Sequence, residues 1–277
     1  MRLKIHGHLA VACIILLLIA GAANALTVGE RTKHFDIIYG AGLQPSDGKR
    51  LEQTLENGYG EINGYYGTLP DRVKVLIVGK ETMDEVGSHV EAFSAWNKKS
   101  SAIVLREETL EQDKQPMLDV VVKHELSHLG INNILCNKDP KQFAWMEEGL
   151  CMVLSKEPLS DSKVSKYIGK QGFLSTPEIA AAVKNDNYNI TKDGYLQSWS
   201  LIHYMVHTFG AQRVIDILRC PDNNFGEAFK LNTGKDFGSF YRQWEDHVTE
   251  LATEAPRQVI PVFGHMSFGK AMIDLKV

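Results

Sequence analysis

The chain has 277 residues, with 30 Lys and Arg against 34 Asp and Glu, which gives a formal net charge of −4. Because the charges are nearly balanced and no polybasic run or RNA-binding motif is present, nucleic acid and anionic membranes are poor candidates as partners. The length suits one good-sized globular domain.

The N-terminus has the three parts of a secretory signal peptide. Residues 1–4 are basic, residues 9–23 are apolar, and Ala23-Asn24-Ala25 is a small-x-small cleavage site. A retained anchor is the less favoured alternative, because a membrane-spanning helix needs about 20 apolar residues. We therefore expect a signal peptide over 1–25, export to the periplasm or medium, and no other association with a membrane. The mature chain, 26–277, is expected to be a single domain with a short C-terminal tail.

The first half of the mature chain is predicted to mix strands and helices. Apolar residues recur at helical spacing between residues 46 and 66, and β-branched residues are concentrated in the predicted strands. The predicted strands are 35–39, 72–78 and 101–105, and the predicted helices are 46–66 and 81–90.

The second half is predicted to be almost entirely helical. An apolar helix from about Gln115 to Gly130 comes first, and helical periodicity then recurs to residue 251. The later helices are expected at 141–155, 160–168, 177–183, 195–209, 211–218 and 237–251, with a possible strand near 259–263. The fold class is therefore α+β: a small mixed sheet in the N-terminal half packs on the 115–130 helix, and helices follow.

This apolar helix contains the pattern His124-Glu125-Leu126-Ser127-His128. Residues four apart lie on one face of a helix, so His124 and His128 can direct two imidazoles at one metal ion. Glu125 is one step around the helix, where it could accept a proton from water. The alternative is a helix with two satisfied histidines, but buried polar groups need partners, and a metal fits this spacing.

A second motif, Trp145-Met146-Glu147-Glu148-Gly149-Leu150, begins downstream, with 19 residues between His128 and Glu148. A catalytic zinc takes three protein ligands and keeps one position open. Together the two motifs resemble the aminopeptidase N type of gluzincin zinc metallopeptidase, most closely the small bacterial peptidase MA-like domains. The resemblance implies a zincin-like fold, one Zn²⁺ per chain, and Glu148 as the third ligand.

The resemblance extends to the segment beginning at Gly194-Tyr195. The family has a helix whose leading Tyr stabilises the oxyanion, and Tyr195 matches it, although the Lys-Gly of the family reads Gln197-Ser198 here. The alternative is a Tyr that packs in the core with Trp199. The resemblance thus implies Tyr195 as an oxyanion donor.

In this family, the last strand before the metal helix is a sheet edge that pairs with extended substrate. Here that strand is 101–105, so Ala102 and Ile103 are candidates for binding peptide by strand addition, unless they belong to an ordinary core strand. His203 and His207 are also spaced i, i+4. Without a carboxylate or Cys in the pattern we expect exposed or capping histidines, with His203 retained as a candidate for lining the substrate cleft.

The mature chain keeps Cys136, Cys151 and Cys220. In an exported protein, one disulfide and one remaining thiol is the simplest arrangement, and three pairings are possible. A bridge between Cys136 and Cys151 would brace the segment joining the two motifs. A buried Cys151 thiol is the alternative, and the sequence does not separate the two.

These observations predict an exported zinc metallopeptidase. His124, His128 and Glu148 would hold the metal, Glu125 would act as general base, and Tyr195 would meet the oxyanion, with a peptide or protein as substrate. Endo- and exopeptidase activity both remain open. The alternative is a catalytically degenerate envelope domain that binds peptide or serves as a scaffold. A structural zinc site would need a fourth protein ligand, and none is evident. Asp119 is a candidate for orienting a zinc-bound His.

Overall fold

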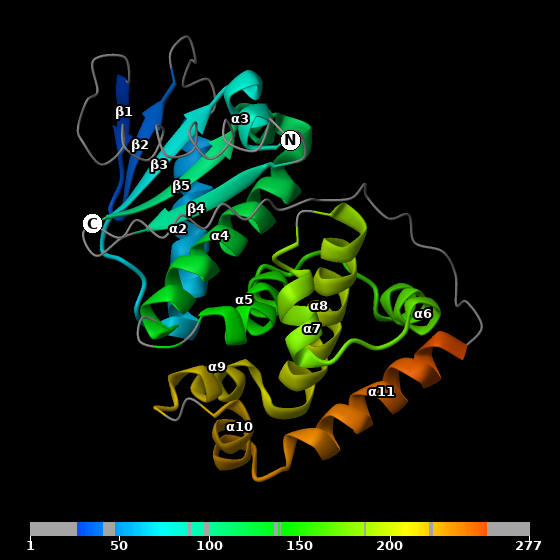
Figure 1. The fold of residues 1–277 in the computed structure, drawn as a ribbon. Coiled ribbons are helices and arrows are strands. Elements are labelled where there is room, and N and C mark those ends of the chain that lie inside the picture. The colour runs from blue at the N-terminus through cyan, green and yellow to red at the C-terminus, as the bar shows by residue number, and fades with distance from the viewer. Residues whose placement is uncertain are drawn as a thin grey trace, which may run out of the picture. The chain divides into compact units, whose positions relative to one another are not determined.

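The structure is a computed structural model (Figure 1) that describes residues 27–40, 48–87, 90–96, 100–135, 138, 140–185, 187–221 and 224–253. The predicted signal peptide, the strand near 259–263 and Cys136 lie outside the described residues. The chain divides into two compact units, one reaching to Gly130 and the other starting at Ile131. This boundary falls within one continuous helix, so the single domain stays a prediction.

The first unit contains a five-stranded mixed sheet with the order β1-β2-β3-β5-β4. The three central strands are parallel to each other, and both outer strands are antiparallel to their neighbours. The strands are β1 (Thr27–Arg31), β2 (Phe35–Tyr39), β3 (Val73–Val78), β4 (Ala92–Trp96) and β5 (Ser101–Arg106). The three strands predicted from the sequence are confirmed as β2, β3 and β5, and they form the centre of the sheet.

Helices cover both faces of this sheet, as the alternation of its side chains requires. The helices of this unit are α2 (Gly48–Tyr66), α3 (Lys80–Val86) and most of α4 (Gln115–Leu135), whose last turn falls in the second unit. Short 3-10 turns at Glu107–Leu110 and Gln112–Lys114 precede α4. Met83 of α3 packs in a cluster on one face with Leu76, Val78, Phe93, Ala102 and Val104. The opposite face meets α2, where the ring of Phe35 contacts Tyr59 edge-on with centroids 5.9 Å apart.

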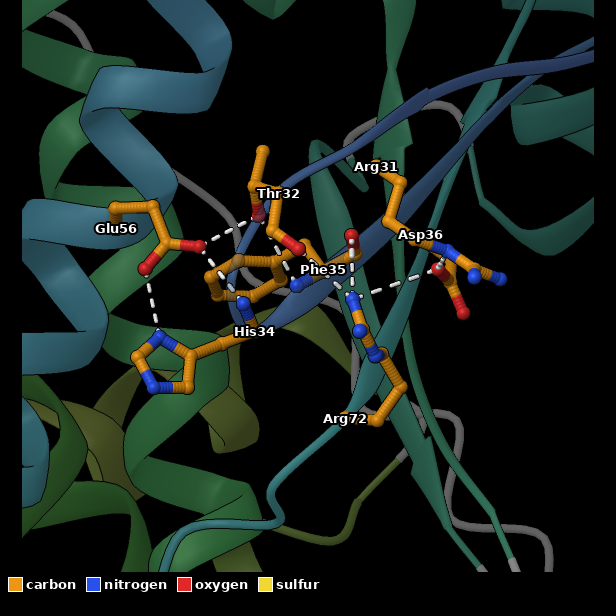
Figure 2. Close-up of polar contacts among 7 residues, drawn as sticks. All are labelled: Arg31, Thr32, His34, Phe35, Asp36, Glu56 and Arg72. Carbon is orange, nitrogen blue, oxygen red and sulfur yellow. Dashed lines mark hydrogen bonds and ion pairs between the residues drawn. The ribbon is translucent and has the colours of Figure 1, made fainter.

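Figure 2 shows how the turn between β1 and β2 is fastened to α2 through Glu56. The backbone N–H of His34 donates to Glu56 at 2.8 Å, the His34 ring lies 2.6 Å from the second carboxylate oxygen, and the Thr32 hydroxyl also donates. Burial raises the pKa of Glu56, but these hydrogen bonds outweigh it, so that the pKa lies below its usual value. Arg72, directly before β3, also holds this turn by donating to the carbonyls of Thr32 and Phe35.

The described residues of the second unit form helices joined by short loops, with no strand among them. It contains α5 (Pro140–Leu154), α6 (Asp161–Gln171), α7 (Thr176–Ala182), α8 (Tyr188–Phe209), α9 (Ala211–Arg219), α10 (Phe225–Thr233) and α11 (Phe237–Thr253). Helix α8 is central, because α5, α6, α7 and α9 all pack against it. Helix α11 lies against α6 and α10.

Aromatic side chains fill much of this helical core. Trp145 of α5 contacts Phe225 and Phe237 with centroids 5.4 and 6.3 Å apart. Trp244 of α11 is fully buried, and its indole N–H donates to the Ser200 hydroxyl of α8 at 3.0 Å. A buried indole needs such a partner, so this bond fixes α11 on α8.

The structure differs from the sequence predictions in several elements. Strands β1 and β4 and helix α10 were not predicted, and α8 begins at Tyr188 instead of Tyr195. Cys151 and Cys220 are buried as thiols, which agrees with the buried-thiol alternative for Cys151. Within the described residues, no helix is both long and apolar enough to cross a membrane.

Candidate metal centre and active site

Helix α4 places His124 and His128 next to each other, as their spacing predicts. Their ring centroids are 5.0 Å apart with the planes at 65°, and their ligand atoms lie within 4.8 Å of one another. The exposed fractions of His124, Glu125 and His128 are 0, 2 and 6 %. Two adjacent imidazoles shielded from water fit a zinc ion, which commonly takes neutral His as a ligand.

Helix α2 supports α4 along its length. The first contact is a hydrogen bond of 2.9 Å from the Gln115 side chain to the Thr54 hydroxyl. Further along, a Cβ at Gly58 would lie 3.1 Å from Val122, and a Cβ at Gly130 would lie 2.5 Å from the ring of Tyr66. The contact residues advance in the same direction along both helices, so α2 and α4 run parallel. The glycines permit their close approach.

Lys123, directly before the first histidine, is a buried cation that the sequence reasoning missed. Its ammonium lies 2.7 Å from Glu61 of α2 and 2.8 Å from Asp119, and only 10 % of its side chain is exposed. Burial lowers the pKa of Lys123, but hydrogen bonds with the two carboxylates outweigh it and raise the pKa above its usual value. Asp119, a candidate for orienting a zinc-bound His, is engaged with Lys123. The sequence signal for a buried cation was a Lys that directly follows three valines in an apolar helix.

Helix α5 carries the second motif in the helical unit. Glu148 is completely buried, Glu147 is 1 % exposed, and Cys151 follows one turn later, also buried. Charged side chains are almost never fully buried without partners, so two adjacent buried glutamates on one helix indicate a specialised site.

Tyr195 is half-buried and lies about two turns inside α8. Beside it, Gln197 takes part in fixing the segment before α7: its amide donates to the Gly172 carbonyl at 3.0 Å and accepts from the Leu174 N–H at 2.9 Å. The departure from the Lys-Gly of the gluzincins at Gln197-Ser198 therefore has a structural role in this chain.

His203 is held by two partners on its own unit. Its ring stacks on Trp199 at a centroid distance of 4.8 Å, and its Nδ1 lies 3.1 Å from Asp161 at the start of α6. The hydrogen bond with Asp161 raises the pKa of His203 although burial opposes it. His207 is exposed, as expected.

The expectation that residues 101–105 form the sheet edge is wrong. Strand β5 pairs with β3 on one side and with β4 on the other, so its backbone groups are engaged in the sheet. Ala102 and Ile103 are 6 and 0 % exposed, and they are core residues of an interior strand. The strand on this side of the sheet that reaches the edge is β4.

A family model of the peptidase MA superfamily matches residues 92–250, which is more than half of the chain. The chain belongs to the peptidase MA superfamily. The matched region begins at β4 and includes α4, α5 and α8, so it contains both motifs. No match was found among curated proteins.

Membership in the superfamily agrees with the α+β architecture and supports the metal-site interpretation. His124 and His128 of the first unit each offer an imidazole nitrogen to a metal, and the second unit carries a buried thiol at Cys151. The donor types, imidazole and thiolate, are those that zinc prefers. The residues of this superfamily domain are thus compatible with a bound transition metal.

Proposed function

We propose that this chain is an exported zinc-dependent metallopeptidase that hydrolyses peptide bonds. The observation that carries the proposal is the buried pair His124 and His128 on one face of α4, within a domain of the peptidase MA superfamily. The expected signal peptide at residues 1–25 supports export.

The proposed zinc ligands are His124, His128 and Glu148. Glu148 is favoured because it occupies the family's ligand position and is a fully buried carboxylate. Cys151, one turn along α5, offers a sulfur ligand and is the alternative third donor. When bound, zinc would supply a Lewis acid that polarises the scissile carbonyl and lowers the pKa of water.

Glu125 is proposed to move the proton. Its carboxylate would accept a proton from the attacking water and deliver it to the leaving amine, as a buried general base and acid can do. Tyr195 would donate a hydrogen bond to the oxyanion that develops on the substrate carbonyl. Proton transfer requires the carboxylate of Glu125, and donation to the oxyanion requires the hydroxyl of Tyr195.

We propose that an extended peptide is held along β4. In the described part of the chain β4 pairs with β5 alone, and its other edge is where a further strand would add. Backbone hydrogen bonds from such an edge would supply affinity for the main chain of an extended peptide.

Zinc content and cleavage of a peptide library together test the proposal. The exported protein should contain about one zinc per chain and lose activity with a chelator. His128→Ala should lose the metal, whereas His207→Ala, an exposed histidine on α8, should keep it. Absence of metal in the parent would refute the proposed function. Bound zinc without any turnover would instead indicate a degenerate, peptide-binding domain.

The third ligand is tested by two further variants. Glu148→Gln should weaken zinc binding strongly, and Cys151→Ser should leave it nearly unchanged. The reverse result would assign the sulfur as the ligand.

A further inference from the structure

Lys123, whose ammonium forms two ion pairs, immediately precedes His124 on α4. Lys123 joins two helices, because Glu61 belongs to α2 and Asp119 to α4 itself. On α2, Glu61 lies one turn after Gly58, the point where a side chain would meet Val122 and Lys123 of α4. The ion pair is therefore placed beside a close approach of the two helices.

Beyond the glycine contacts at Gly58 and Gly130, burial alone does not choose one rotation of α4 about its axis. Every residue from 121 to 131 is buried, so this segment has no polar face that would have to point to solvent. Apolar side chains repack with modest cost, whereas a hydrogen-bonded charge pair is directional and needs its partner in one place. A buried polar contact of this kind can select one register among several.

A small rotation of α4 would matter for metal binding. Side-chain tips lie about 5–6 Å from a helix axis, so a turn of roughly 10° moves them by about 1 Å. Metal–ligand distances tolerate only about 0.2 Å. The backbone carbonyl of Lys123 also accepts a hydrogen bond of 2.8 Å from the Ser127 hydroxyl, beside His128.

We propose that Lys123 is a positioning residue, which through Glu61 fixes the rotation of α4 on α2 and so aims His124 and His128 at the metal. The inference rests on the proposed zinc site. The side chains of Glu61 and Asp119, the partners of Lys123, are 30 and 41 % exposed. Removing the Lys123 ammonium therefore leaves two carboxylates that water can solvate. Lys123→Met should therefore remove the contact without leaving a buried, unpaired charge.

The experiment measures zinc affinity by competition with a chelator, together with the absorption spectrum of the cobalt-substituted protein. Lys123→Met should weaken zinc binding about 10- to 100-fold, the range for contacts that orient ligands, and should alter the cobalt spectrum. Lys123→Arg, which can keep the ion pair, should restore most of both. Lys114→Met removes an exposed ion pair with Glu111 and serves as the matched control, with no expected change.

Glu61→Gln keeps the ammonium paired with Asp119 and should give a smaller loss of affinity in the same direction, which covers the case that Lys123→Met does not fold. A parent that binds zinc, with affinity and cobalt spectrum unchanged in Lys123→Met and Glu61→Gln, would overturn the inference alone. A parent that binds no zinc would overturn the proposed function and the inference with it.

Discussion

A Cβ placed on Gly149 would lie 2.5 Å from Cγ1 of Ile202, so α5 and α8 touch directly beside Glu148. The same Cβ would lie 2.7 Å from the Ser198 backbone carbonyl, which cannot move without shifting α8. The residue after the proposed ligand is thus a glycine because of helix packing, and this contact ties the Glu148 helix to the Tyr195 helix.

Gly149→Ala should lower the free energy of unfolding by about 1–3 kcal/mol, the usual cost of forcing an extra group into a packed core. Chemical denaturation measures this change. The matched control is Gly64→Ala on α2, where a Cβ meets no atom within 4 Å. That substitution should stabilise by about 0.5–1 kcal/mol, because glycine is a poor helix residue. Equal effects at both positions would contradict the packing argument.

Glu125→Gln should abolish peptide cleavage and leave zinc bound. The amide cannot accept the proton from water, and loss of a general base costs about 100- to 10,000-fold in rate. Steady-state kinetics and metal analysis on the same sample check this. Glu111→Gln, which changes an exposed glutamate before α4, is the control. Loss of zinc from Glu125→Gln would show that Glu125 is a ligand instead.

Tyr195→Phe should lower kcat by about 100- to 1,000-fold with little change in KM, because the hydroxyl is proposed to act only as the oxyanion forms. Stability should change little, since the ring is kept. Tyr204→Phe is the matched control, because Tyr204 lies on the same helix and stacks on His247. Parent-like kcat in Tyr195→Phe would place the oxyanion donor elsewhere.

The pair of His203 and Asp161 should make stability depend on pH. Hydrogen bonding with Asp161 raises the pKa of His203 above 6.5, and the bond with His203 lowers that of Asp161 below 3.8. The stabilisation from His203 is therefore complete below pH 6.5 and is lost as the pH rises through the raised folded-state value. The stabilisation from Asp161 is lost only in acid, as the pH falls through its lowered folded-state value.

Unfolding measured from about pH 5 to about pH 9 tests this dependence, because histidine changes charge within that range. Asp161→Asn should be less stable than the parent at the acidic end and nearly equal at the alkaline end. His207 and His247 also act on Asp161, so their charges contribute to the slope. Asp216→Asn, which removes an ion pair with Arg219, should differ from the parent by a constant amount. A constant difference for Asp161→Asn would refute the prediction.

The sequence predicted those elements whose signal is local. The His-Glu-x-x-His pair required only the helical repeat, and its adjacency is confirmed. Helix α10 has local signals that were overlooked, since Asn224 caps its first turn and Gly234 ends it in a left-handed conformation.

Strand order could not be predicted in the same way. Strand β4 has the sequence Ala-Phe-Ser-Ala-Trp, which has little β-branched character, and it exists because it pairs with β5. Missing β4 moved the predicted edge to β5 and led to the wrong choice of Ala102 and Ile103. The Lys123 contact was likewise invisible, because Glu61 lies 62 residues away in the chain.

The distribution of tryptophan makes intrinsic fluorescence a probe of one of the two units. Of its four tryptophans, Trp96 belongs to the sheet unit, whereas Trp145, Trp199 and Trp244 are buried in the helical unit. Intrinsic fluorescence will therefore follow mainly the helical unit during denaturation. If its transition and that of the far-ultraviolet circular dichroism fail to coincide, the two units unfold at different denaturant concentrations, and a single two-state analysis no longer applies.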